Sequence, residues 1–260
     1  MTVQERRNYI LDTLQSSRTV RATQLALALD VSTETIRRDL EYLEKESQLI
    51  RIHGGASILQ YDSREYPFAH RLANHADAKE EIARTALQYV SEGQSIALDF
   101  STTCSTFAHE LKRSFNNLTI ITNSIEVLNI FSDAPTHTVI YLGGIMNAAE
   151  RGCFGGQAVQ ALRQLNIDTA FISFGGISFR EGFTETFYDG AEVLRELIRS
   201  AQQKIALLDS SKFDRVTLIS VCPISDVDLV ITDSDIKPDV LSKYRTAIDI
   251  VCPKKEAAEV

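Results

Sequence analysis

The sequence lacks several features that would place it in a familiar class of protein. No apolar run approaches the roughly 18 residues that a membrane-spanning helix needs, and the opening stretch MTVQERRNYI has no apolar segment after its charges. We therefore expect no membrane partner and no secretory signal, which leaves the cytoplasm as the expected location.

Cysteine and the common catalytic motifs are equally scarce. Only four cysteines occur, and no two form a Cys-x-x-Cys pair, which argues against a disulfide framework or a zinc site. The five histidines are not at metal-ligand spacing, and the glycines form no dinucleotide-binding or Walker motif. We therefore expect no metal, no cofactor and no catalytic residue.

The chain also has no excess of positive charge, since its formal net charge is −8 over 260 residues. This balance argues against indiscriminate binding of nucleic acid by the whole molecule. Residues 1–57, however, hold eight Lys/Arg and eight Asp/Glu, so the remainder carries the entire negative charge. The asymmetry predicts two modules with different partners.

The first module contains three helical patterns in quick succession. Apolar side chains recur at i, i+3 or i+4 spacing in residues 4–17, 21–30 and 32–46. Only Asp-Val-Ser separates the second pattern from the third, and so short a turn between two helices is typical of a helix-turn-helix. Ser32 or Thr33 is expected to cap the third helix.

Polar side chains of the third helix must face outward at its N-terminal end if its apolar side chains face inward. In a helix-turn-helix, that end reaches base edges in the major groove, where arginine pairs with guanine. The alternative is a solvated helix face, with Arg38 paired to Glu34 and Glu41. The expected DNA contacts on this helix are Ser32, Thr33, Thr35, Arg37 and Arg38.

The segment QLIRIHGGAS, residues 48–57, favours the DNA-binding interpretation. A short apolar strand followed by Gly-Gly predicts a small hairpin, or wing, after the recognition helix. Arg51, His53 and Gly54 are expected to lie on this wing, where the two basic side chains can touch phosphates.

Three segments, ERRNYILDTL, TIRRDLEYLE and IRIHGGA, together resemble the DeoR family of bacterial transcription regulators. The resemblance implies that the Thr-Ile-Arg-Arg-Asp-Leu helix and the wing form a winged helix-turn-helix domain, at residues 1–57. Residues 58–78 read as a linker. Arg71, Asn74 and Lys79 fit a pattern common in the family, and we interpret them as domain-docking residues.

From residue 79 to residue 260, helices alternate with continuous apolar strands. This alternation predicts an α/β domain with a mostly parallel sheet covered by helices on both faces. Such sheets bind ligands outside the carboxyl ends of their strands. The expected strands are residues 95–100, 118–123, 137–144, 168–176, 204–209, 227–232 and 247–253.

Small polar residues collect after these strands. Hydroxyl and N–H groups at a helix start can form an anion pocket, and Lys212 can supply a positive charge. The same residues are also ordinary helix caps and turn formers, so the hypothesis depends on several strand ends sharing one sheet. The expected effector-binding residues are Ser101, Thr102, Thr103, Thr122, Asn123, Ser124, Gly143, Gly144 and Lys212.

The family's sensor domain resembles the sugar-phosphate isomerase fold, which implies a phosphorylated sugar as effector. The phosphate loop of that fold corresponds here to residues 99–103, so the resemblance adds Asp99 to the expected effector-binding residues. A loosely matching segment adds Glu185, as a sugar contact or a helix-start acid. Ser101 stands where glycine is usual in the family. A side chain at this position can narrow the phosphate pocket or change what it admits.

The sequence thus predicts a repressor of a carbohydrate-utilisation operon, controlled by a phosphorylated sugar. A DNA-binding domain of this size reads few base pairs. We therefore expect a homo-oligomer, either a dimer or a tetramer, on paired half-sites of double-stranded operator DNA. One alternative is a sugar-phosphate isomerase-like enzyme carrying a DNA-binding tail, with Asp99, Glu185, Asp209 and Lys212 as candidate acid-base groups. Another is a winged domain that binds a second protein.

Overall fold

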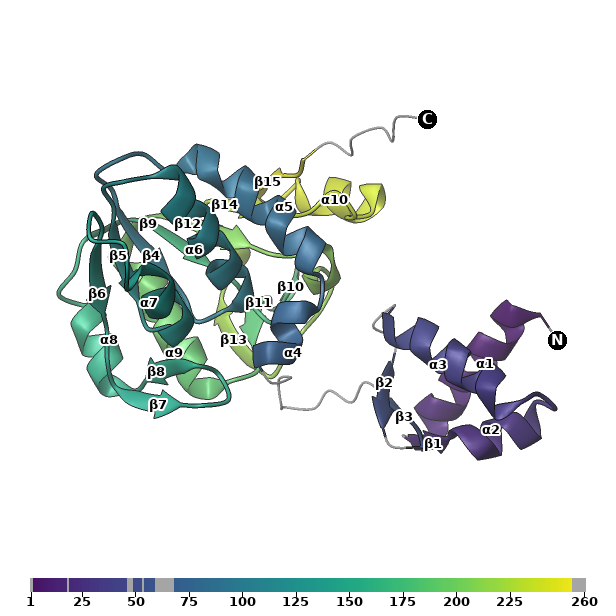
Figure 1. The fold of residues 1–260 in the computed structure, drawn as a ribbon. Coiled ribbons are helices and arrows are strands. Elements are labelled where there is room, and N and C mark those ends of the chain that lie inside the picture. The colour runs from purple at the N-terminus through teal and green to yellow at the C-terminus, as the bar shows by residue number, and fades with distance from the viewer. Residues whose placement is uncertain (1, 18, 46–48, 53, 59–67, 254–260) are drawn as a thin grey trace. The chain divides into compact units, whose positions relative to one another are not determined.

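The chain forms two compact units in the computed structural model, Met1–Asp62 and Ser63–Val260 (Figure 1). The structure describes residues 2–17, 19–45, 49–52, 54–58 and 68–253. Each unit encloses a hydrophobic core of its own, which is the property that allows a domain to fold independently.

The first unit combines three helices with a small antiparallel sheet of order β1-β3-β2. The predicted helix-turn-helix and the hairpin after it are both confirmed, whereas the first strand was not predicted. The elements are α1 (Val3–Ser17), β1 (Thr19–Arg21), α2 (Ala22–Ala28), α3 (Thr33–Lys45), β2 (Leu49–Ile52) and β3 (Gly55–Ile58).

The core of this unit is built from the apolar faces that the helical periodicity indicates. Ile10 and Leu14 of α1 are buried against the core, as are Ile36, Leu40 and Leu43 of α3. Each buried side chain of this size stabilises the fold by about 1.5–3 kcal/mol. The inward position of Ile36, Leu40 and Leu43 leaves the polar side chains at the N-terminal end of α3, among them Thr33, Arg37 and Arg38, at the surface.

Two glycines shape the turn between β2 and β3. Gly54 has φ +81°, a backbone conformation that residues with a Cβ adopt only under strain. Gly55 lies so close to β1 that a Cβ atom would come within 1.9 Å of the carbonyl oxygen of Val20. The pair therefore permits both the tight turn and the three-stranded sheet.

A seven-stranded sheet of order β15-β14-β12-β9-β4-β5-β6 forms the centre of the second unit. All of its pairings are parallel, so the carboxyl ends of its strands share one edge. The strands are the seven that the sequence predicts: β4 (Ser95–Leu98), β5 (Thr119–Thr122), β6 (Thr138–Tyr141), β9 (Ile167–Ile172), β12 (Ala201–Leu207), β14 (Leu229–Ile231) and β15 (Asp249–Val251).

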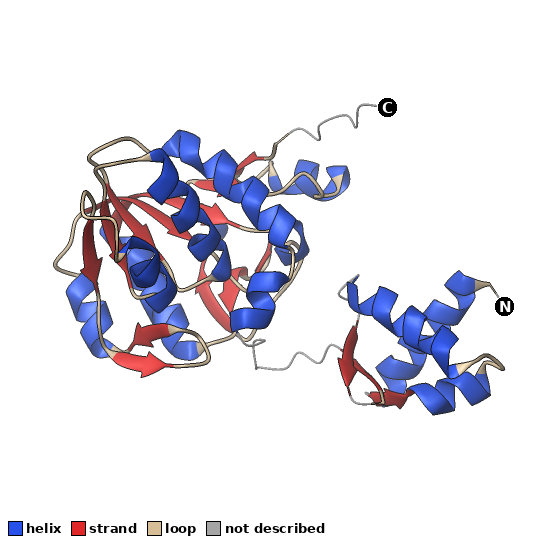
Figure 2. Ribbon diagram, in the orientation of Figure 1, coloured by secondary structure: helices blue, strands red, loops and turns tan. Residues whose placement is uncertain are grey.

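Helices cover both faces of this sheet (Figure 2). Alternate residues of β4 illustrate the arrangement, because Ile96 and Leu98 enter one buried cluster whereas Ala97 enters the other. One face is covered by α5 (Ala76–Ala86), α6 (Thr102–Ser114) and α7 (Ile125–Phe131), and the other by α8 (Gly156–Leu162), α9 (Tyr188–Ser200) and α10 (Pro238–Tyr244).

Several short elements of this unit were not predicted. One is a helix inside the predicted linker, and the others form a hairpin and a three-stranded antiparallel sheet of order β10-β11-β13. None of the helices in the described part of the chain has the length and apolar character needed to cross a bilayer. The additional elements are α4 (Phe68–Ala73), β7 (Ile145–Asn147), β8 (Gly152–Phe154), β10 (Gly176–Ser178), β11 (Gly182–Glu185) and β13 (Ile219–Cys222).

Candidate functional site

The N-terminal end of α3 is held in place by a serine cap. Ser32 Oγ accepts a hydrogen bond of 3.0 Å from the backbone N–H of Thr35 and lies 2.9 Å from the Thr35 hydroxyl. Ser32, and not Thr33, is therefore the N-cap, and such a cap contributes about 1 kcal/mol. Thr33 remains exposed at the first position of the helix.

Two arginines project from the first turns of α3 into solvent. The side chains of Arg37 and Arg38 are 70% and 79% exposed, and each guanidinium lies 3.7 Å from a carboxylate oxygen of Glu34. Exposed ion pairs of this kind contribute at most about 1 kcal/mol. Both arginines can therefore leave Glu34 for a phosphate or a base edge at little cost.

The wing presents a further cation. Arg51 is exposed on β2, and its backbone N–H donates a 3.1 Å hydrogen bond to Glu44 Oε1 at the end of α3. Gly54 is exposed at the turn that follows. The predicted contact of His53 lies outside the described residues.

In the second unit, successive strands are added toward one side of the sheet from β4 to β6 and toward the other side from β9 to β15. The strand order therefore reverses between β4 and β9, and open α/β sheets bind ligands at such a point. Asp99 lies at this point and is fully buried. One of its carboxylate oxygens accepts the N–H of Ser101 at 2.7 Å, and the other accepts the N–H of Ser173 at 2.6 Å. Burial raises the pKa of Asp99, and these hydrogen bonds oppose the rise. Asp99 thus joins the ends of β4 and β9.

Two of the predicted hydroxyl groups act as helix caps. Ser101 Oγ accepts the N–H of Cys104 at the start of α6, and Ser124 Oγ accepts the N–H of Val127 at the start of α7. Thr102 and Thr103 are buried in the first turn of α6. The first backbone N–H groups of α6 therefore point toward the carboxyl edge of the sheet, whereas the N–H of Ile125 in α7 donates to the carbonyl oxygen of Arg151.

The end of β5 is tied to the hairpin β7–β8. Thr122 is buried and donates its hydroxyl proton to the carbonyl oxygen of Leu98 at 2.7 Å. Asn123 is also buried; its Nδ2 donates to the carbonyl oxygen of Cys153, whereas its Oδ1 has no hydrogen-bond partner in the described part of the chain. Gly143, with φ +67°, and Gly144, with φ +109°, form the turn after β6.

A cluster of charge surrounds the end of β12. Asp209 is buried, and its pKa lies below the ordinary value because Lys212 and other neighbouring cations outweigh the effect of burial. Lys79 of α5 is buried close by, and burial lowers its pKa to about 8, a shift that Asp209 opposes. Lys79 Nζ donates to the carbonyl oxygens of Arg71, at 2.5 Å, and Asn74.

The short helix α4 is fixed by contacts within the second unit. Arg71 forms a half-buried ion pair of 2.5 Å with Glu150, and the N–H of Phe68 donates to the carbonyl oxygen of Ala149. From the sequence, we interpret Arg71, Asn74 and Lys79 as domain-docking residues. That interpretation stays a prediction. Within the second unit, Lys79 interacts electrostatically with Asp209 and Lys212, a proximity that the sequence of residues 71–79 alone does not indicate.

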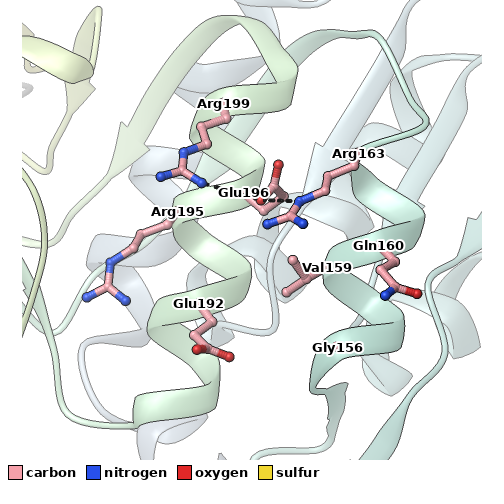
Figure 3. A pocket seen from close by; sticks show the side chains of 8 residues that line it. All are labelled: Gly156, Val159, Gln160, Arg163, Glu192, Arg195, Glu196 and Arg199. Carbon is pink, nitrogen blue, oxygen red and sulfur yellow. Dashed lines mark hydrogen bonds and ion pairs between the residues drawn. The ribbon is translucent and has the colours of Figure 1, made fainter.

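Glu185 lies apart from the central sheet, at the end of β11. Its carboxylate accepts the N–H and the hydroxyl of Thr186 just before α9, which is the arrangement of a helix-start acid. An open groove of about 350 Å³ lies between α8 and α9, where Arg163 and Arg199 pair with Glu196 and Arg195 points away from it (Figure 3). None of the predicted effector residues lines this groove.

Comparison with known proteins agrees with both units. The model of the DeoR-like helix-turn-helix domain matches residues 6–61, and that of the DeoR C-terminal sensor domain matches residues 74–234. The chain is 31% identical to the HTH-type transcriptional regulator GolR of Listeria innocua, over 94% of this chain and 95% of that protein. It is 30% identical to the glycerol-3-phosphate regulon repressor of Escherichia coli, over 88% of this chain and 90% of that protein.

Among solved structures, ribose 5-phosphate isomerase A from Methanocaldococcus jannaschii matches with a TM-score of 0.38 and 18% identity. That match covers 53% of this chain and 54% of the isomerase. The family matches cover both units and, together with the winged helix-turn-helix and the parallel α/β sheet, identify the protein: the chain belongs to the DeoR family of transcription regulators.

Proposed function

We propose that the chain represses a carbohydrate-utilisation operon and that a phosphorylated sugar binds its second unit and weakens its hold on operator DNA. The observation that carries the proposal is the burial of Lys79 beside Asp209 and Lys212 at the carboxyl edge of the sheet. A buried ammonium group with a lowered pKa gains strongly from an anionic ligand, whose charge offsets the loss of water.

The operator-binding residues are those of α3 and the wing. Arg37 and Arg38 read base edges, Thr33 contacts the backbone or a thymine methyl, and Arg51 and the turn at Gly54 lie along phosphates. Ser32 and Thr35 hold the end of α3 through the cap. His53 remains a predicted phosphate contact.

Several strand ends supply the proposed effector site. Lys212 and the N–H groups at the start of α6 bind the phosphate, with Ser101, Thr102 and Thr103 around it. Asn123 Oδ1, buried and without a partner in the described residues, accepts a hydrogen bond from a sugar hydroxyl. Thr122 and Ser124 hold this loop, Gly143 and Gly144 leave room for the ligand, and Asp99 orders the loop without touching it.

The regulatory link runs through α4. This helix follows residues 59–67, the stretch of chain that joins the two units, and Lys79 binds carbonyl oxygens at its C-terminal end. An effector phosphate that draws Lys79 away would free α4 and bias the arrangement of the DNA-binding units. The second unit also forms the homo-oligomer, dimer or tetramer, that paired half-sites demand. Operator binding places the action in the bacterial cytoplasm.

The second unit binds its sugar phosphate without turning it over. Both oxygens of Asp99 already accept backbone N–H groups, so this carboxylate is badly placed to remove a substrate proton. Asp209 is engaged by the hydroxyl and N–H of Ser211. Steady product formation from any of a panel of sugar phosphates would favour an isomerase-like enzyme instead.

The direct test is fluorescence anisotropy with labelled fragments of the DNA upstream of the protein's own gene. We expect one fragment to bind at least tenfold more tightly than a scrambled duplex, and one sugar phosphate of the panel to reduce that binding. Binding that no member of the panel alters would refute the effector proposal. Equal affinity for every fragment would instead favour a winged domain that recognises another protein.

A further inference from the structure

A buried carboxylate lies on the recognition helix directly after its two exposed arginines. Asp39 of α3 is only 3% exposed and faces inward among Ile36, Leu40 and Leu43. A carboxylate in such surroundings is costly unless its charge is balanced and its oxygens accept hydrogen bonds. Its partners therefore constrain α3 more than the apolar contacts around it.

Both partners come from α1. Arg6 Nε lies 2.5 Å from Asp39 Oδ2, and Arg7 Nε lies 3.2 Å from Asp39 Oδ1, so each oxygen takes one guanidinium. Arg7 is fixed further, because its Cζ lies 3.4 Å from the centroid of the Tyr42 ring, one turn along α3. The four side chains make a continuous polar contact between the two helices.

This contact differs in kind from the apolar core beside it. The hydrophobic effect has no preferred direction, so the apolar core restricts the rotation of α3 only through the shape of its packed side chains. Charge-assisted hydrogen bonds require defined distances and angles. Buried ion pairs also add little net stability, and their best attested use is to fix one arrangement among several.

The rotation of α3 decides where Arg37 and Arg38 point. On a helix whose side chains reach about 5–6 Å from the axis, a turn of about 20° moves a tip by about 2 Å. That displacement is enough to break a hydrogen bond to a base edge. Arg6 and Arg7 themselves are 11% and 19% exposed, whereas Arg37 and Arg38 are more than two-thirds exposed.

We propose that Arg6, Arg7 and Asp39 set operator specificity as positioning residues: they fix the rotation of α3 and contact no nucleotide. The inference rests on the proposed role of α3 in reading the operator. It predicts that specific and non-specific binding respond differently to a change in this contact. Phosphate contacts alone support non-specific binding, and they do not require base edges to be aligned.

The test is the double variant Arg6→Lys/Arg7→Lys in the full chain. Lysine keeps both positive charges but loses the planar fork and much of the stacking on Tyr42. Anisotropy titrations on the operator fragment and on a scrambled duplex, each over a salt series, give the specificity ratio and the salt slope. We expect the ratio to fall at least tenfold, while scrambled-duplex affinity and salt slope stay unchanged.

A second variant keeps the inference testable if the double variant does not fold. Tyr42→Leu removes only the ring that fixes Arg7. We expect the specificity ratio to fall about threefold, which corresponds to the loss of about 0.7 kcal/mol from one exposed cation–π contact. Folding is checked by circular dichroism, and Arg113→Lys, an exposed arginine on α6 paired with Glu110, is the matched control.

Three results separate the possibilities. A wild-type protein with no preference for any fragment would contradict the proposed function itself. A wild-type protein that discriminates, with folded variants that discriminate equally well, would overturn only the positioning role. The third result would come from Arg7→Gln. A fall of about 0.9 in the salt slope of this variant would mean that Arg7 contacts a phosphate directly, which would also overturn the positioning role.

Discussion

The two units differ in the exposure of the cations that we propose bind their ligands. In the first unit, Arg37 and Arg38 stand in solvent and share one exposed carboxylate. In the second, Lys79 is buried next to Asp209 and has a lowered pKa. A duplex is too large to enter a cavity, so its partners must project. A small anion can be enclosed, and enclosure strengthens its interaction with a cation.

The same comparison explains why an acidic protein can bind DNA. Surface arginines act over roughly one Debye length, about 10 Å at moderate salt, so distant acidic residues have little influence on them. The neutral first unit therefore suffices to present two arginines to a base edge. The negative charge of the remainder discourages binding of DNA elsewhere on the molecule.

The largest expected effect concerns the exposed cations. Arg37→Ala and Arg38→Ala should each weaken operator binding tenfold to a hundredfold, since a bidentate base contact contributes about 1–3 kcal/mol. Neither change should lower the melting temperature, because the pairs with Glu34 are exposed. Anisotropy and thermal denaturation measure the two quantities, with Arg113→Ala of α6 as control. Intact operator binding in both variants would contradict the assignment of α3.

The enclosed cations should show the reverse behaviour. Lys212→Met should leave operator affinity unchanged but weaken the effect of the active sugar phosphate about tenfold, since a charge-assisted hydrogen bond contributes about 1.5–3 kcal/mol. Lys79→Met should weaken the effect likewise, and it should also lower operator affinity without effector because it loses the contacts that hold α4. Lys204→Met is the matched control, because Lys204 lies on β12, the strand that precedes Lys212, and pairs with Asp228. An unchanged response in both site variants would place the anion pocket elsewhere.

Enclosure of Lys79 also predicts a dependence of stability on pH. The unfolded chain keeps this proton up to about pH 10.5, whereas the folded chain releases it near pH 8. Between these values the unfolded state binds more protons, so the free energy of unfolding should rise with pH. Urea denaturation at pH 8 and pH 10 measures this rise in the free energy of unfolding. We expect the rise to be about 1–3 kcal/mol smaller in Lys79→Met than in wild type. Parallel curves for the two proteins would exclude a buried, perturbed Lys79.

The smallest expected effects concern the serine caps, which both units share. Ser32→Ala and Ser124→Ala should each cost about 1 kcal/mol of stability in the unit concerned. Ser101→Ala should cost a similar amount and also weaken the effector response, because its hydroxyl lies in the proposed phosphate loop. Calorimetry together with the anisotropy assay separates the two consequences. A normal effector response in Ser101→Ala would restrict this residue to its structural role.

Features that depend on neighbouring residues could be predicted from the sequence. The helix-turn-helix, the wing and all seven strands of the central sheet follow from periodicity and from turn residues such as Gly54. The strands β1, β7, β8 and β10 have only three residues each and, unlike the equally short β14 and β15, do not lie within a longer apolar run of the sequence. The helix α4 lies in a stretch of weak periodicity and was interpreted as linker.

Features that depend on distant parts of the chain could not be predicted. Lys79 was interpreted as a docking residue, and its proximity to Asp209 could not be predicted because it arises only when α5 packs against the second unit. The contact of Arg6 and Arg7 with Asp39 was missed for the same reason, although all three residues lie within segments that the sequence marked. Ser101 and Ser124 were singled out as polar strand ends, and the structure shows that both cap helices; their part in effector binding stays a prediction.

The most direct test of the account is one anisotropy titration series on the operator fragment, with wild type, Arg38→Ala and Lys212→Met, each with and without the active sugar phosphate. The account predicts tight binding by wild type and by Lys212→Met, binding at least tenfold weaker in Arg38→Ala, and release by the sugar phosphate from wild type alone. Release of Lys212→Met to the same extent as wild type, or unimpaired binding by Arg38→Ala, would contradict the division of labour between the two units.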